Sequence, residues 1–177
     1  NEINPTGHKG LTISALSAID TAVWDIVGKA VNLPLHKGFG ACRDKVKTYA
    51  SGGLWLSQSI DELLEQSEAF LQMGFRAMKV RVGNERIEDD VARVRALREA
   101  LGTDIELLAD ANQAFSPKQA IRLGRRLEEY QLTWLEEPVV AYDLEGHAEV
   151  RSALDTPIAS GETEYTRYGM KAMIQAP

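Results

Sequence analysis

Three acidic residues are evenly spaced along the chain, and each follows a short apolar segment typical of a buried strand. Asp110, Glu136 and Glu162 are separated by 26 residues in each case. The ends of neighbouring parallel strands lie about 5 Å apart, so these side chains are expected to converge. Converging carboxylates repel one another unless a cation neutralises them. An all-oxygen donor set with open positions favours Mg²⁺ over Ca²⁺ or Zn²⁺. The spacing therefore predicts a Mg²⁺ site, and the alternative is that each acid caps a helix or pairs with an arginine.

Two cations precede the first of these acids on another predicted strand. Lys79 and Arg81 lie two residues apart in segment 77–82, so both side chains project from one face. Buried cations are costly without an anionic partner, which the acids or an anionic substrate would supply. A lysine in a dry site can also accept a proton near neutral pH. We therefore predict that both cations face the acids and a substrate, with a structural ion pair to Asp110 or Glu136 as the alternative.

Three further residues are candidates for supporting roles. Asn112 is expected to hydrogen-bond a metal-binding carboxylate or the substrate, and a turn is its alternative role. Glu137 is expected to orient the lysine or a metal ligand. Trp55 follows a glycine-rich segment expected to form a flexible lip near the substrate. Trp24 and Trp134 are expected to pack in the core or in loops.

Strand and helix patterns alternate along the positions that carry these residues. Strands are expected at 46–50, 77–82, 105–109, 133–135 and 157–160, and helices at 11–31, 59–73, 88–101, 116–130, 144–154 and 165–174. Such alternation indicates parallel βαβ units, and a strand spacing of about 26–31 residues is typical of a barrel. A doubly wound open sheet is the alternative architecture. No glycine-rich phosphate-binding motif follows the first strand, which weakens a nucleotide-binding interpretation.

Composition excludes several classes of protein. The chain has 177 residues, a formal net charge of −6 and 44% hydrophobic residues, which is typical of a folded globular domain. The acidic balance argues against a nucleic-acid partner. No apolar run is expected to approach the ~20 residues that span a bilayer, so we expect no membrane partner. Cys42 is the single cysteine, which excludes an intrachain disulfide and favours a reducing, cytoplasmic location.

The ordered motifs resemble the enolase superfamily, in its mandelate racemase and muconate lactonizing enzyme-like branch. These motifs are Lys79-x-Arg81, Asp110-x-Asn112, Leu135-Glu136-Glu137-Pro138 and Ser160-Gly161-Glu162. The resemblance implies an α/β fold, a modified TIM barrel of the (β/α)₇β type, of which about five strands are expected here. It also implies that residues 1–45 end an α+β capping domain, that residues 46–177 begin the barrel, and that the three acids hold one Mg²⁺.

The resemblance further implies proton abstraction next to a substrate carboxylate, with Mg²⁺ and nearby cations stabilising an enediolate. Arg81 occupies a position where this branch usually has a lysine base, and arginine stays protonated. We therefore expect a lyase that eliminates water from a sugar acid. The alternatives are a racemase or epimerase of a 2-hydroxy acid and, from another class, a non-catalytic βα-repeat module. The general base is expected on strands outside this chain, and a homo-oligomer is expected by analogy.

Overall fold

The computed structural model describes residues 7–176, which form two compact units. One unit contains the described residues up to Lys47 together with Thr163–Ile174. The other contains Thr48–Glu162, and all of the candidate site residues lie in it. Each unit is described by itself.

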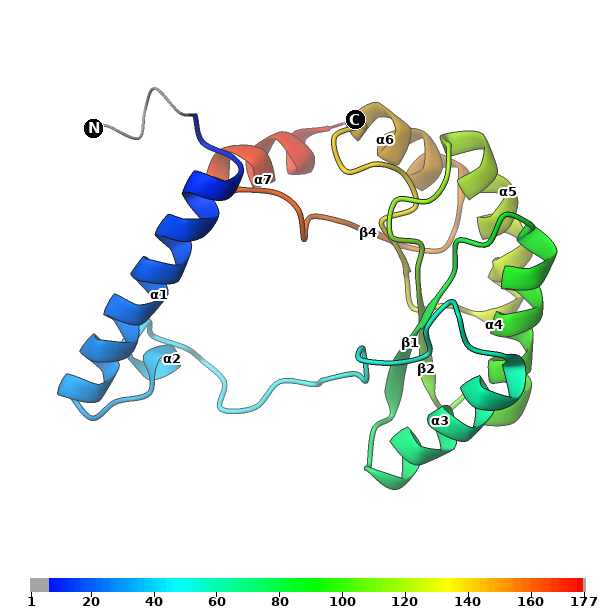
Figure 1. Cartoon of the computed structure of the whole chain (residues 1–177), viewed down its shortest axis with the longest axis horizontal. Helices are drawn as coiled ribbons and strands as arrows, with labels where there is room; N and C mark the ends of the chain where they lie inside the picture. Colours follow the sequence, from blue (N-terminus) through cyan, green and yellow to red (C-terminus); the bar gives the residue numbers. More distant parts are fainter. Residues whose placement is uncertain (1–6, 177) are drawn as a thin grey trace. The chain divides into compact units, whose positions relative to one another are not determined.

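Strands and helices alternate through the larger unit, as the sequence predicts. Four parallel strands pair in the order in which they occur along the chain. They are β1 (Ala77–Arg81), β2 (Glu106–Asp110), β3 (Leu135–Glu136) and β4 (Ile158–Ala159). The helical elements between them are α3 (Ile60–Gln72), α4 (Ile87–Leu101), α5 (Pro117–Leu127), the short 3₁₀ helix η2 (Glu128–Tyr130) and α6 (Leu144–Ala153). Figure 1 shows α3, α4 and α5 along the same side of β1 and β2. The α/β class and the parallel βαβ units are therefore confirmed.

The expected strand at 46–50 is reduced to one bridge. Ala50 pairs in parallel with Met78, and its amide donates to the Ala77 carbonyl at 2.9 Å. The chain then leaves the sheet, although the carbonyl of Leu54 still accepts from the Arg81 amide at 3.0 Å. Five strands were predicted, and four are present in the sheet formed by the described residues. The expected strand at 46–50 is wrong, because only its last residue, Ala50, pairs with β1.

The helix starts predicted from capping residues are confirmed. Ser59 and Glu62 form a capping box at the start of α3, in which the Ser59 amide donates to Glu62 Oε2 at 2.7 Å. Ser116 and Gln119 form an equivalent box at the start of α5, with Pro117 as the first helical residue. Each box satisfies amides that a helix leaves without intrahelical partners.

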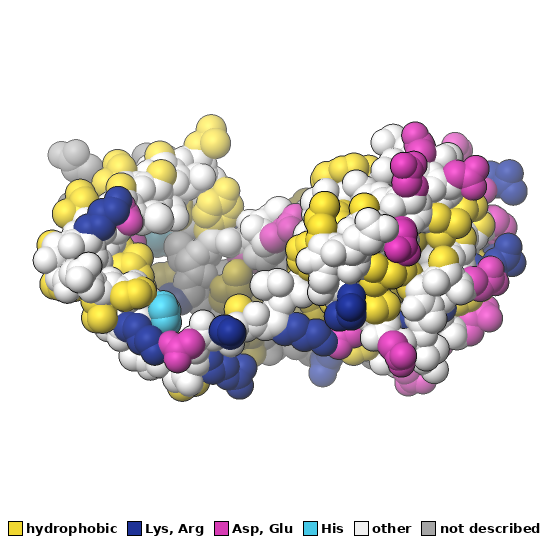
Figure 2. Space-filling model, turned by 90° about the horizontal axis from the view of Figure 1, so that it is seen from below, with side chains coloured by type: hydrophobic (Ala, Val, Ile, Leu, Met, Phe, Trp, Pro, Cys, Tyr) yellow, Lys and Arg dark blue, Asp and Glu magenta, His cyan; other side chains and the backbone are white. Residues whose placement is uncertain are grey.

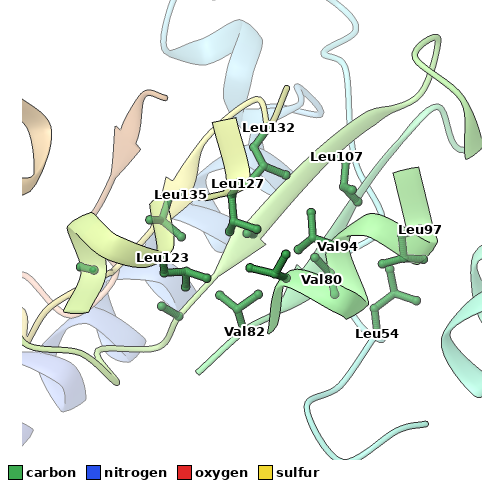
Figure 3. Close-up of a cluster of buried hydrophobic side chains, with 14 of the residues drawn as sticks. Leu54, Val80, Val82, Val94, Leu97, Leu107, Leu123, Leu127, Leu132 and Leu135 are labelled. Atoms are coloured by element: carbon green, nitrogen blue, oxygen red, sulfur yellow. The ribbon is translucent and has the colours of Figure 1, made fainter. Parts of the chain in front are cut away.

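The core lies on the helix-covered face of the sheet. Alternate residues of β1 and β2, together with Leu135 of β3, point toward this face and are buried. Figure 3 shows them meeting leucines and valines of the helices, and the labelled members include Val80, Leu107, Leu135, Val94, Leu97, Leu123 and Leu127. Burying a side chain of this size contributes about 1.5–3 kcal/mol, so this face holds the sheet and helices together.

Two helices approach each other closely at a glycine. Gly124 of α5 is buried, and a Cβ placed there would overlap the side chain of Leu154, the residue that ends α6. The absence of a side chain at position 124 thus lets α6 pack against α5, which fixes the path of the chain between β3 and β4.

The smaller unit contains α1 (Leu11–Ala30), α2 (Leu35–Gly38) and α7 (Thr166–Gln175). An ion pair joins its two chain segments, with Lys9 Nζ 2.7 Å from Glu164 Oε1. The helix expected at 11–31 is confirmed, but Gly28 is its one buried residue. Hydrophobic side chains lie on the surface of this unit, on the left of Figure 2.

Helix α1 also corrects one expectation from composition. It contains an 18-residue window of mean hydropathy 1.3 with at most two charged residues, so by length and composition it is able to cross a bilayer. The prediction that no segment approaches this limit was therefore wrong. Core helices of folded domains and secretory signals pass the same test, so these two properties alone do not assign α1 to a membrane.

Candidate active site

A buried lysine links the first two acids. Lys79 is 4% exposed, and its Nζ lies 2.9 Å from Asp110 Oδ2 and 2.8 Å from Glu136 Oε1. The register of the sheet explains why these two acids lie close together, because Asp110 of β2 pairs directly with Glu136 of β3. Lys79 therefore supplies the positive charge that lets two carboxylates approach each other in a buried place.

Arg81 occupies the same row of the sheet. It pairs in register with Asp110, and its guanidinium donates a hydrogen bond to the carboxylate of that residue. A longer contact of 3.4 Å joins it to Asn112 Oδ1. The Trp55 ring covers the guanidinium at 5.1 Å, while remaining 48% exposed. Arg81 is therefore held on several sides as a fixed positive charge, which is a poor arrangement for a base.

Asn112 and Trp55 both contact Arg81. The backbone N–H of Asn112 donates to Asp110 Oδ1 at 2.9 Å, and the φ of Asn112, 44°, is in the left-handed region. In this structure Asn112 is a turn residue that contacts Asp110 through its backbone, and its side chain accepts from Arg81. The loop carrying Trp55 is fixed by Arg93 of α4, which donates to the carbonyls of Trp55 and Gln58 at 2.6 Å each.

Glu136 has a different donor at each oxygen. Oε1 accepts from Lys79, and Oε2 accepts from Trp134 Nε1 at 3.0 Å. Behind them lies Tyr49, whose ring is 5.8 Å from Lys79 Nζ and packs edge-on against Trp134. The carboxylate of Glu136 is therefore oriented from two sides.

Glu162 and Glu136 line the same small cavity. The cavity has a volume of about 230 Å³, and its lining includes Glu136, Glu137, Ser160 and Glu162. Glu162 itself is exposed, two residues beyond Ser160. Within residues 7–176, no three His, Cys, Asp or Glu side chains gather closely enough to hold a metal ion as they stand. The structure thus joins Asp110 and Glu136 through Lys79, and it links Glu162 to Glu136 through the cavity.

Glu137 has a partner that sequence reasoning did not anticipate. It is 1% exposed, and its Oε2 accepts from Gln113 Nε2 at 2.8 Å rather than from Lys79. Gln113 also accepts from the Ala141 amide at 2.9 Å, so the pair connects the loops that follow β2 and β3. Glu137 therefore braces those loops in this structure.

The alternative role of helix cap does not fit Asp110 and Glu136, because other residues cap the helices that follow them. The residue before α5 is Ser116, and the residue before α6 is Asp143. Asp143 Oδ1 accepts from the Gly146 amide at 2.8 Å. Asp110 and Glu136 are thus left to face the cations rather than a helix terminus. The other alternative, an ion pair with Lys79 or Arg81, is present.

The loop after β1 is held by a further buried acid. Asp90 of α4 accepts hydrogen bonds from the amides of Gly83 and Asn84 and from the Asn84 side chain, at 2.7–3.3 Å. Burial raises the pKa of Asp90 above its ordinary value, and these hydrogen bonds oppose the rise. Burial likewise lowers the pKa of Arg93, and the charge of Asp90 opposes that change. Both residues fix loops beside the charged strand ends.

The contact of Trp134 with Glu136 was not predicted, although the sequence contains a signal for it. Trp134 lies two positions before Glu136, and side chains two apart in a strand share a face. The same periodicity that predicted Lys79 and Arg81 on one face therefore predicts Trp134 on the same face as Glu136. Tyr49 and Arg93 carried no such signal, because their roles depend on contacts between segments far apart in the sequence.

The donor set fits Mg²⁺ rather than a softer metal. Asp110, Glu136 and Glu162 offer oxygen atoms, which are the ligands that Mg²⁺ prefers. Glu137 Oε1 and Ser160 Oγ are buried and have no hydrogen-bond partner among the described residues, and both residues line the cavity. Partnerless buried oxygens beside a cavity are costly unless a cation or water satisfies them.

A parallel α/β sheet with charged residues at the carboxyl ends of its strands is the arrangement of a barrel-type active-site face. The Enolase C-terminal domain-like family model matches residues 62–177, and the mandelate racemase / muconate lactonizing enzyme N-terminal domain model matches residues 5–40. The chain therefore belongs to the enolase superfamily, in its mandelate racemase and muconate lactonizing enzyme-like branch.

Individual relatives are similar over most of this chain. L-talarate/galactarate dehydratase of Salmonella typhimurium is 44% identical over 88% of the chain and 39% of its own length. Its structure liganded with Mg and L-lyxarohydroxamate matches with a TM-score of 0.93 and 40% identity, over 98% of this chain and 44% of that one. A racemase from Streptomyces coelicolor with bound magnesium matches with a TM-score of 0.93 and 39% identity, over 97% and 48% of the two chains. The chain thus spans about half the length of the relatives that it matches.

Proposed function

We propose that this chain carries the metal- and carboxylate-binding part of a Mg²⁺-dependent enzyme that eliminates water from a sugar acid. The observation that carries the proposal is the row of Arg81, Asp110 and Glu136 across three adjacent strand ends, with Lys79 between the two acids. Similarity to L-talarate/galactarate dehydratase supports this choice of reaction.

Asp110, Glu136 and Glu162 are the proposed ligands of Mg²⁺. When bound, the ion would act as a Lewis acid toward a substrate carboxylate and stabilise the negative charge that develops there. Each of the three residues lies at the end of a strand or in the loop that follows it, where substrate has access.

Lys79 and Arg81 are the proposed cationic side of the site. Both are held in place before substrate arrives, so their charges need no reorganisation when charge develops on the substrate. Lys79 alone can exchange a proton, because arginine stays protonated. We therefore assign Lys79 to proton transfer or carboxylate binding, and Arg81 to electrostatic stabilisation.

The proposed reaction is the elimination of water from a sugar acid to give a 2-keto acid. A general base removes the proton from the carbon next to the carboxylate, and the hydroxyl group on the neighbouring carbon takes a proton from a general acid and leaves as water. The enol that remains rearranges to a 2-keto acid, with no net oxidation or reduction. We propose that the general base is not supplied by this chain. Arg81 stands at the position where this branch usually has a lysine base, and arginine stays protonated.

The test uses the complete gene product with Mg²⁺ and a panel of aldonic and aldaric acids, beginning with L-talarate and galactarate. Formation of 2-keto acid is expected from at least one substrate. Glu136→Gln should lose Mg²⁺ binding, measured by calorimetry, together with turnover, whereas Glu145→Gln on the exposed face of α6 should keep both. A folded protein that binds no Mg²⁺ would contradict the proposal.

A racemase or epimerase is the second candidate, and similarity to the magnesium-bound racemase favours keeping it. Such an enzyme exchanges the α-proton with solvent without losing water. In deuterated buffer, NMR distinguishes deuterium incorporation into recovered substrate from formation of 2-keto acid. If racemisation is the true activity, Arg81→Lys should add proton exchange on one face of the substrate.

We also propose the wider setting of the chain. Its substrate would be a small carboxylate, with no nucleic-acid or membrane partner, and the protein would be a cytoplasmic homo-oligomer. Residues 1–45 would end a capping domain and residues 46–177 would begin the barrel, which the two family matches support. Light scattering of the complete protein tests the oligomer, and cell fractionation tests the location.

A further inference from the structure

The orientation of Glu136 depends on an indole group. Trp134 Nε1 lies 3.0 Å from Glu136 Oε2, while Lys79 holds the other oxygen at 2.8 Å. An indole N–H is a donor and never an acceptor, so in this contact Trp134 donates and the carboxylate of Glu136 accepts. The carboxylate is therefore fixed at both ends before any ligand binds.

Trp134 is itself held by an aromatic neighbour. The rings of Tyr49 and Trp134 have centroids 5.5 Å apart and an interplanar angle of 83°, which is a favourable edge-to-face contact. The Tyr49 ring also lies 5.8 Å from Lys79 Nζ. One aromatic pair thus supports both of the donors that hold Glu136.

We propose that Trp134, backed by Tyr49, is a positioning residue that orients Glu136 for Mg²⁺ and thereby raises the affinity of the site. This inference rests on the proposed function, since it takes Glu136 as a metal ligand. A carboxylate that is already oriented loses less rotational freedom when it binds an ion. Partners that orient a ligand from outside the coordination sphere are typically worth about 10–100-fold in metal affinity.

A purely structural role for Trp134 makes a different prediction. If the indole only fills space between β3 and Tyr49, then its replacement lowers stability and leaves Mg²⁺ affinity unchanged. Affinity for the metal alone, measured without substrate, therefore separates the two roles.

The experiment titrates Mg²⁺ into the complete gene product by calorimetry. Trp134→Phe keeps an aromatic ring and removes the N–H donor, and it should weaken binding about tenfold. Site-specific replacement of Trp134 by benzothienylalanine exchanges N–H for sulfur at nearly constant shape, so it should give the same loss even if Trp134→Phe folds poorly. Trp24→Phe is the matched control, because Trp24 lies in the smaller unit, and it should bind as the parent does.

Each outcome gives a definite answer. Weaker binding in both Trp134 variants, with the control unchanged, supports the inference. Parent-like affinity in the benzothienylalanine variant overturns it and leaves the proposed metal site intact. Failure of the folded parent to bind Mg²⁺ overturns the proposed function and this inference together, and parent and variant data thus distinguish the two failures.

Discussion

The two faces of one small sheet have opposite chemistry. Residues at even positions of β1, such as Met78 and Val80, are fully buried among apolar side chains of the helices. Residues at odd positions, Lys79 and Arg81, meet carboxylates on the other face. A strand of five residues therefore contributes to the apolar core with one face and to the ion pairs with the other, since side chains alternate along a strand.

The difference teaches how each face tolerates change. On the apolar face, stability depends on volume and shape, because closely packed side chains leave few voids. On the charged face, stability depends on pairing, because each charge is acceptable only while its partner is present. A substitution of similar size should thus have different consequences on the two faces.

The largest expected effect is on the charged face. Lys79→Met removes the cation between Asp110 and Glu136 and leaves two acids close together, which should cost about 3–5 kcal/mol of stability. Urea denaturation of the complete protein without Mg²⁺ measures the loss. Lys118→Met on the exposed surface of α5 should change stability by less than about 0.5 kcal/mol. Equal stability of the two variants would refute the view that Lys79 holds the acids together.

Removing volume from the apolar face should have a similar or slightly smaller effect. Leu123→Ala leaves a cavity among fully buried neighbours and should destabilise the fold by about 2–5 kcal/mol. Val46→Ala, at a position that is largely exposed, serves as the control and should be nearly neutral. Thermal and urea denaturation measure both. A small effect of Leu123→Ala would mean that the helices relax into the space.

Adding volume behind the apolar face should cost less. Gly124→Ala places a methyl group against Leu154 and should destabilise by about 1–3 kcal/mol. Combining it with Leu154→Ala should recover part of this loss, because the two side chains would share one space. Gly52→Ala faces open space and is the control. Additive losses in the double variant would show that the two residues do not compete for that space.

The smallest expected effect is the pH dependence of stability that arises from Asp90, a buried acid of α4. Asp90 has a raised pKa in the folded protein because of burial, so the folded state takes up a proton at a higher pH than the unfolded state. Lowering the pH through the folded pKa toward 3.8 should therefore raise the free energy of unfolding of the parent relative to Asp90→Asn, which does not titrate there. Unfolding curves at several pH values measure this difference, and the opposite slope would exclude a raised pKa.

Much of this arrangement was accessible from the sequence because it depends on local periodicity. Strand alternation placed Lys79 and Arg81 together, and capping boxes located the starts of α3 and α5. The fixed spacing of strand ends brought Asp110 beside Glu136. These features follow from residues that are neighbours along the chain or that occupy equivalent places in successive βα units.

The remainder depended on contacts between distant segments. Glu137 binds Gln113 rather than Lys79, and Arg93 of α4 holds the loop that carries Trp55. Both contacts arise from loop conformations, including left-handed backbone at Gln113 and Glu137, that the residue types do not favour. Segment 46–50 has the composition of a strand. Strand pairing depends on contacts with another strand, however, and only Ala50 pairs with β1, through Met78.

The lysine between two acids has a consequence for the order in which ligands arrive. Asp110, Glu136, Glu137 and Glu162 together with Lys79 and Arg81 carry a formal charge of −2 in total. This negative charge attracts a divalent cation and repels a free sugar acid. When Mg²⁺ binds in the proposed site, the formal charge becomes zero, and the repulsion of a substrate carboxylate is removed. Steady-state kinetics of the complete enzyme should therefore follow a sequence in which the metal enters first and the acid second.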